Sequence, residues 1–107
     1  MKKTKVHFTH DAGQAVLDYL TEVQSWIFQH EVSAWHQLTA HVLKGPMQRI
    51  HDKLLWRREF ELKINSAEAI ALSIILSRYS WDDRDAFSQM AIRTLQFDLP
   101  VLTEGYQ

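Results

Sequence analysis

The chain has 107 residues, of which 46% are hydrophobic and 11% aromatic, and its formal net charge is −1. This composition indicates one folded domain spanning residues 1–107 and excludes a disordered chain. The absence of cysteine excludes a disulfide framework, thiol nucleophiles and thiolate metal sites.

The start of the chain and its apolar runs indicate where the protein works. Residues 1–5 are basic, but residues 6–11 lack the apolar core of a signal peptide. The longest apolar run, Ile74 to Leu76, is far too short to cross a bilayer. A total charge near zero gives no general attraction to nucleic acid or to anionic membranes. We therefore expect a soluble cytoplasmic protein.

Residues 4–9 alternate in character, with Val6 and Phe8 on one side and Lys5 and His7 on the other. This period of two predicts a short, half-buried strand.

The next segment predicts one long helix over residues 11–44. Residues 11–43 contain no proline, one glycine, four acidic residues and neither Lys nor Arg. A helix over residues 12–43 would be ~48 Å long at about 1.5 Å per residue, whereas a compact chain of this size has a diameter of about 33 Å. Such a helix either breaks near His30 or is covered by a second copy of the chain. No strong helix breaker is present, so we favour the continuous helix and the second copy.

The apolar residues of this helix form two stripes that face different ways. The first stripe is Val16, Leu20, Val23 and Ile27, and the second is Phe28, Val32, Trp35 and Val42, with Leu38 and Leu43. The second stripe lies where the helix outruns its own domain. We therefore expect Phe28 and Trp35 to contribute to a subunit interface.

Gly45 and Pro46 mark the end of this helix. We expect Gly45 to adopt the left-handed conformation that closes a helix, with Pro46 in the first turn of a shorter helix reaching Trp56. Residues 59–64 then alternate strictly, which predicts a strand with Phe60, Leu62 and Ile64 inward. This strand pairs either with residues 4–9 or with its symmetry mate, and the second possibility adds those three residues to the predicted interface.

Two further helices complete the predicted order. Asn65 caps a helix that is apolar almost all round and therefore central. Ser80 begins the last helix, with acidic residues in its first turn and a core face made of Phe87, Met90, Ala91, Thr94 and Phe97. The fold class is mostly α (α+β): four or five helices with a minor two-stranded β element at about 4–9 and 59–64.

The histidines do not form a metal-binding pattern. Two ligands on one helix are three or four positions apart, whereas His30, His36 and His41 are separated by six and five positions. The pair His51-Asp52 resembles the adjacent ligands of metal-dependent phosphohydrolases named for that dipeptide, which also require distant His and Asp ligands. We favour a surface pair and expect no metal or cofactor.

Basic residues recur at Arg49, Lys53 and Arg57, with Arg58 beside them. This basic stripe over residues 49–58 would follow a phosphate backbone or meet an acidic surface. We favour a structural role for it within the protein.

No nucleophile and base pair, and no phosphate-binding loop, is recognisable in the chain. We therefore predict a non-enzymatic interaction or regulatory protein that acts as a homodimer, with an unidentified protein partner as a further possibility. The alternatives are a nucleic-acid-binding regulator using the basic stripe and, less favoured, a small metal-dependent hydrolase using His51 and Asp52.

Overall fold

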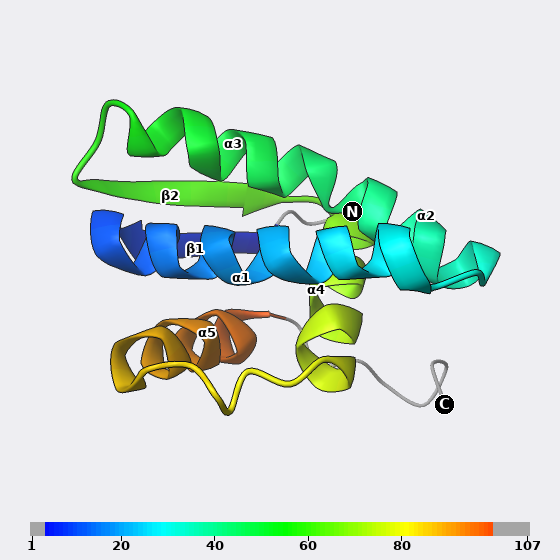
Figure 1. Ribbon diagram of the computed structural model, residues 1–107. Coiled ribbons are helices and arrows are strands. Elements are labelled where there is room, and N and C mark those ends of the chain that lie inside the picture. Colours follow the sequence, from blue (N-terminus) through cyan, green and yellow to red (C-terminus); the bar gives the residue numbers. More distant parts are fainter. Residues whose placement is uncertain (1–3, 100–107) are drawn as a thin grey trace.

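A computed structural model describes residues 4–99 of the protein (Figure 1). The elements are β1 (Thr4–Thr9), α1 (His10–His30), α2 (Ala34–Val42), α3 (Lys44–Leu54), β2 (Glu59–Ile64), α4 (Ser66–Arg78) and α5 (Ala86–Asp98). The predicted mostly helical α+β fold with two strands is confirmed. Within residues 4–99, no helix combines the length and the apolar character needed to cross a membrane.

The two strands pair antiparallel, with Thr4 opposite Ile64 and Thr9 opposite Glu59. Their pairing within one chain confirms one of the two predicted arrangements. Alternate residues are buried along both strands, so one face of the sheet is in the core. The rings of Phe8 and Phe60 meet there, with their centroids 5.5 Å apart.

Helix α1 crosses the inner face of this sheet, and α3 and α5 lie on either side of α1 (Figure 1). Helix α3 packs beside β2, and α5 packs beside β1. The first apolar stripe of α1 is buried, as its period predicts. Helix α4 packs against α2 and α5. The Cα radius of gyration is 13.2 Å, close to the value of about 13 Å for compact chains of this length.

The prediction of one helix over residues 11–44 is wrong. Helix α1 ends at His30, residues 31–33 are not helical, and α2 turns back along α1. Gln24 Nε2 donates to the carbonyl of Ala40 at 2.9 Å across this hairpin. Gln37 Nε2 donates to the carbonyls of Ile27 and Glu31, so it satisfies the C-terminal end of α1. The side chains of α2, rather than a helix breaker, stabilise the turn.

The expected helix end at Gly45 is also wrong. Helix α3 begins at Lys44, directly after Leu43, and no described glycine has a positive φ. A Cβ atom at Gly45 would lie 2.6 Å from Glu68 Oε2, so a side chain there would displace that carboxylate. Pro46 is in the first turn of α3, where its missing N–H has no consequence.

Helix α5 begins at Ala86 rather than at Ser80. Asp85 is its N-cap and accepts a hydrogen bond from the Ser88 N–H at 2.7 Å. This backbone bond lowers the pKa of the Asp85 carboxyl. The predicted core face is wrong in part, because the buried residues of α5 are Ala91, Ile92 and Leu95.

The predicted cap of α4 is confirmed. The Asn65 side chain accepts from the Glu68 N–H at 2.9 Å, and Glu68 Oε1 accepts from the Asn65 N–H at 3.0 Å. This reciprocal capping box fixes the start of α4 at the end of β2.

Tyr19 ties α1 to the end of α4, and its replacement should lower stability. Its buried hydroxyl donates to the carbonyl of Tyr79 at 2.9 Å, and burial raises its pKa. Tyr19→Phe should lower the free energy of unfolding by about 1–2 kcal/mol, because that carbonyl loses its donor. Urea denaturation measures the change. Gln14→Ala, which removes an exposed bond to Asp18, is the control and should change stability by less than about 0.5 kcal/mol.

Asp85→Asn tests the electrostatic part of the α5 cap. Because folding lowers the pKa of this carboxyl, its charge stabilises the fold above the ordinary Asp pKa and loses that effect as pH falls through the folded-state value. The stability of the wild type relative to Asp85→Asn should therefore be larger at pH 6 than at pH 2.5. Urea midpoints of both proteins at the two pH values measure it. An equal difference at both would contradict the role of the charge.

Candidate functional site

Half of the large exposed hydrophobic residues among residues 4–99 lie within one short segment of the chain. They are Trp26, Phe28, Val32, Trp35 and Leu38. Four of them lie within residues 28–38, on either side of the turn between α1 and α2 in the sequence, and we call this surface the apolar end: Phe28, Val32, Trp35 and Leu38. Val32 is 98% exposed and Leu38 60% exposed. Exposed apolar groups of this number in one place are typical of interaction surfaces.

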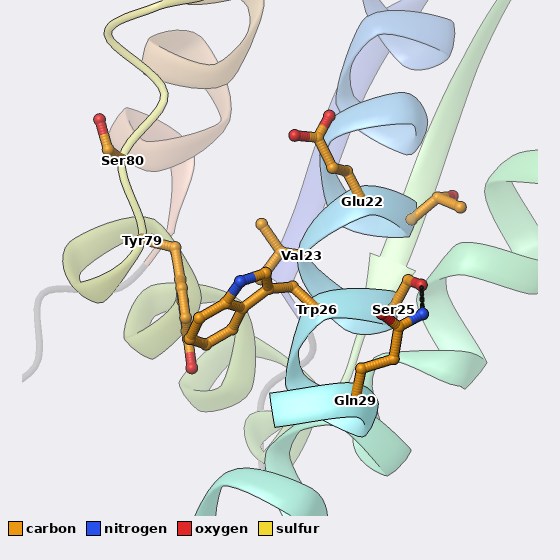
Figure 2. Close-up of a pocket in the computed structure, with 8 residues that line it drawn as sticks. Glu22, Val23, Ser25, Trp26, Gln29, Tyr79 and Ser80 are labelled. Atoms are coloured by element: carbon orange, nitrogen blue, oxygen red, sulfur yellow. Dashed lines mark hydrogen bonds between the residues drawn. The ribbon is translucent and has the colours of Figure 1, made fainter. Parts of the chain in front are cut away.

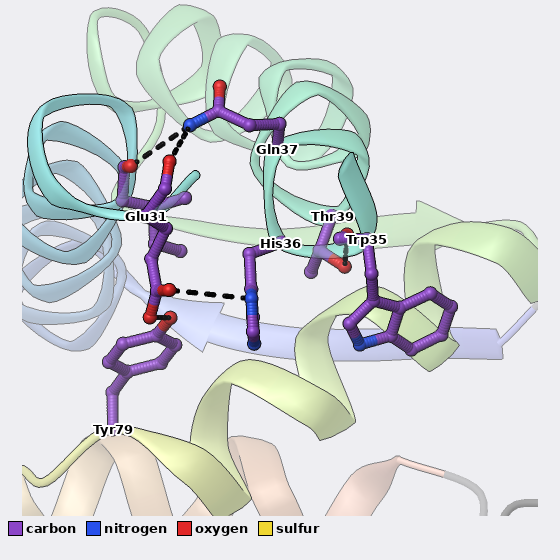
Figure 3. A network of polar contacts seen from close by, with 7 residues as sticks. Glu31, Trp35, His36, Gln37, Thr39 and Tyr79 are labelled. Carbon is purple, nitrogen blue, oxygen red and sulfur yellow. Dashed lines mark hydrogen bonds and ion pairs between the residues drawn. The ribbon is translucent and has the colours of Figure 1, made fainter. Parts of the chain in front are cut away.

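A polar network lies beneath the apolar end and connects it to α4 (Figure 3). Tyr79 Oη donates to Glu31 Oε1 at 3.2 Å, and His36 Nδ1 lies 3.4 Å from Glu31 Oε2. Burial, followed by the charge of Glu31, raises the pKa of the Tyr79 hydroxyl. Glu31 thus joins three elements through one carboxylate. The turn that presents Val32 is held in a defined position.

The hydrogen-bonding groups of His36 are almost entirely enclosed. Both ring nitrogens are buried, and neither makes a hydrogen bond of normal geometry within residues 4–99. The ring points from α2 toward Glu31 and α4 (Figure 3). Both ring nitrogens of this histidine are therefore shielded from solvent.

A groove runs along the other side of α1, between this helix and the segment after α4 (Figure 2). Its volume is about 460 Å³. The Trp26 and Tyr79 rings meet edge to face there, with their centroids 5.8 Å apart. Glu22, at its rim, is paired with Arg84. The groove contains aromatic surface, the hydroxyl groups of Thr21, Ser25 and Ser80, and the paired carboxylate of Glu22.

The basic stripe is divided by the structure. Arg49 Nη2 donates to Glu68 Oε1 at 2.5 Å and to the carbonyl of Lys63 at 3.1 Å. Lys53 Nζ donates to the carbonyl of Glu61 at 2.7 Å. Two of the four basic side chains are thus bound to the protein itself.

Arg57 and Arg58 are exposed in the connection between α3 and β2. They are separate from the contacts that Arg49 and Lys53 make. Of the four charges, the one on Arg49 is offset by the Glu68 carboxylate.

Among the described residues, no further His, Asp or Glu joins His51 and Asp52 in a group that could hold a metal ion. His51 Nδ1 lies 3.7 Å from Asp52 Oδ1, and both side chains are exposed. Gln48 Nε2 donates to Asp52. In the part of the chain that the structure describes, no three His, Asp or Glu side chains are close enough together to hold a metal ion. The pair remains an exposed contact on α3.

The predicted interface is only partly available. Phe28 and Trp35 are exposed at the apolar end. Phe60, Leu62 and Ile64 are buried in the core against their own chain, so the prediction that they line an interface is wrong. Strand β2 pairs with β1 of the same chain. Its apolar side chains are therefore covered by the core.

Sequence analysis also missed part of the exposed apolar surface. Phe87, Met90 and Phe97 on α5 were assigned to the core, but all three are exposed. The pairs Ala91–Leu95 and Ile92–Leu95, at spacings of four and three, gave an alternative stripe. Side-chain size favoured the wrong stripe, because the three exposed residues are the larger ones.

No protein-family model matches this chain, and comparisons with curated proteins and with solved structures find no match either.

Replacing Arg49 tests whether the basic stripe has a structural role. Arg49→Met removes the charged partner of the buried Glu68 and the donor to the Lys63 carbonyl. Because Arg49 is partly exposed, we expect the free energy of unfolding to fall by about 1–3 kcal/mol, below the range for fully buried pairs. Thermal and urea denaturation measure it. Arg57→Met, the matched control, should change stability by less than about 0.5 kcal/mol. Equal effects of the two substitutions would contradict this role.

Proposed function

We propose that the protein is a non-enzymatic interaction protein with a regulatory role that assembles as a homodimer through its apolar end. The observation that supports this proposal is the exposure of Phe28, Val32, Trp35 and Leu38 around one turn. Tryptophan and other aromatic residues provide much of the binding energy at protein interfaces.

The charge of this surface favours a second copy as the partner. In a two-fold symmetric contact, a surface meets itself, so any unpaired charge near the axis faces an identical charge. Residues 26–43 contain a single acidic residue, Glu31, and neither Lys nor Arg. Glu31 is partly buried, and Tyr79 and His36 contact its carboxylate. Lys44, whose Nζ lies 5.5 Å from the centroid of the Phe28 ring, is the basic side chain beside this surface. The rest of the surface carries little charge that would repel a second copy.

The rigidity of the turn also supports the proposal. Gln37 closes the end of α1, and Glu31 fixes the turn against Tyr79. A surface that is already ordered loses little conformational entropy when it binds. Stable interfaces bury about 800 Å² per partner, so the four apolar side chains would form the centre and the polar residues around them the rim.

The alternatives have less support. A nucleic-acid-binding role would depend on Arg57 and Arg58 alone, since Arg49 and Lys53 are bonded within the chain. A hydrolase role would depend on the single exposed pair His51 and Asp52. Neither arrangement offers a surface as extensive as the apolar end.

A charge placed in the apolar end should prevent dimer formation. Leu38→Glu would bury an unpaired carboxylate at the interface, so the dimer dissociation constant should rise at least 100-fold, or about 3 kcal/mol. Sedimentation equilibrium from 5 to 500 µM measures it. Leu55→Glu is the matched control, because Leu55 is 63% exposed but lies after α3; it should leave the dimer unchanged. A wild-type protein that remains monomeric at 500 µM would refute the proposal.

A further inference from the structure

The two edges of the small sheet differ in whether side chains bond their outward backbone groups. At the outer edge of β2, Arg49 donates to the Lys63 carbonyl and Lys53 donates to the Glu61 carbonyl. In an antiparallel ladder, the N–H and C=O of one residue point to the same side. The backbone groups of Lys63 and Glu61 therefore point away from β1. Cations from α3 satisfy the carbonyls of this edge.

The register then shows which groups point outward from β1. Lys5 lies opposite Lys63, and His7 lies opposite Glu61. The backbone N–H and C=O groups of Lys5 and His7 must therefore point away from β2. Within residues 4–99, β1 has no second neighbouring strand, and no hydrogen bond reaches these groups from another element. The edge of β1 offers the donors and acceptors that a further strand would use.

Helix α5 adds an apolar wall beside this edge. Its core residues pack toward β1 and α1. On one flank, Gln89 donates to the Asp82 and Arg84 carbonyls and Arg93 lies over the Trp81 ring. The other flank exposes a stripe of apolar side chains, and this α5 stripe consists of Phe87, Met90 and Phe97. Because α5 packs beside β1, the α5 stripe is carried by the helix that neighbours this edge.

The outer face of β1 is basic. Lys5 lies directly opposite Lys63 on the exposed face of the sheet. Like charges in this position repel one another, and neither lysine forms an ion pair within the described residues. An acidic side chain on the far side of Lys5 would relieve this repulsion.

We propose that the free edge of β1 binds an extended segment of another protein as a third strand. Alternate apolar residues of that segment would face the α5 stripe, and the acidic residues between them would lie beside Lys5. This is strand addition, in which backbone bonds provide affinity and alternate side chains provide specificity. Pairing of β1 with a second copy is disfavoured, because β1 contains no acidic residue that could lie beside Lys5.

This site is separate from the apolar end, so it extends the proposed function without depending on it. The α5 stripe and β1 lie beside α1 at its first half, whereas the dimer surface lies at the turn after α1. Leu38→Glu should therefore leave strand binding unchanged.

Amide exchange and peptide titration of the full chain test the site together. In the free protein, the amides of Lys5 and His7 should exchange rapidly, while those of Val6 and Phe8 are protected. The probe is a pool of nine-residue peptides with glutamate at alternate positions and valine, isoleucine, leucine or phenylalanine between them. At up to 1 mM, this pool should shift the Lys5 and His7 amides and protect them from exchange. A pool with lysine in place of glutamate should bind at least tenfold more weakly.

Substitutions that keep the fold identify the two contacts. Lys5→Glu should reverse the preference, so that the lysine pool binds better than the glutamate pool. Met90→Ser should weaken binding of the glutamate pool about tenfold, whereas Leu55→Ser, an exposed site elsewhere, should not.

Four results would overturn the proposal: protected Lys5 and His7 amides in the free protein, no binding of the glutamate pool at 1 mM, shifts confined to other surfaces, or a charge preference that Lys5→Glu leaves unchanged. Self-association that Lys5→Glu strengthens would assign this edge to a second copy instead.

Discussion

Glu68 is the one charged residue that the fold buries within residues 4–99, and three elements meet at its carboxylate. Its side chain bonds the Asn65 N–H at the start of α4 and the Arg49 guanidinium on α3. A buried carboxylate is tolerated only when it is paired and hydrogen-bonded. Its position explains why Gly45 has no side chain, why α4 starts where β2 ends, and why part of the basic stripe is turned inward.

The contacts of α3 with the end of β2 also determine which edge of the sheet can bind another chain. Because Arg49 and Lys53 bond the outer edge of β2, that edge offers little to another chain. The opposite edge has no such protection among the described residues. The three helices α1, α3 and α5 on the inner face form a layer wider than the two strands (Figure 1). The proposed strand site is at this edge of β1, and the apolar end lies elsewhere, at the turn after α1.

The local features of the fold could be predicted from the sequence because local physics determines them. The alternation of residues 59–64 and the cap at Asn65 required only a period of two and one capping side chain. The break at residues 31–33 could not be predicted in this way. It depends on Gln37, which bonds α1 only after the hairpin has closed, and no residue in the turn is a strong breaker.

The exposed surfaces were predicted less well than the elements. Trp35 is exposed, as predicted, but the predicted reason is wrong, because Trp35 belongs to the short helix α2 and not to a long helix that outruns the domain. Met90 and Phe97 were assigned to the core since large apolar residues at helical spacing usually define the buried face. On α5, the smaller residues Ala91 and Ile92 are buried instead. Two apolar stripes overlap on α5, and only one of them packs against β1 and α1. Side-chain size and period do not show which one.

The register of the sheet also determines the order in which the molecule can form. Thr4 pairs with Ile64, so β1, the first element, has no ladder until the chain has continued through three helices. Contacts between distant parts of a sequence form slowly, because the intervening loop must first close. The α1–α2 hairpin, whose contacts are close in sequence, should assemble before the sheet. During synthesis, the apolar side chains of β1 therefore remain without their partner strand until β2 has been made.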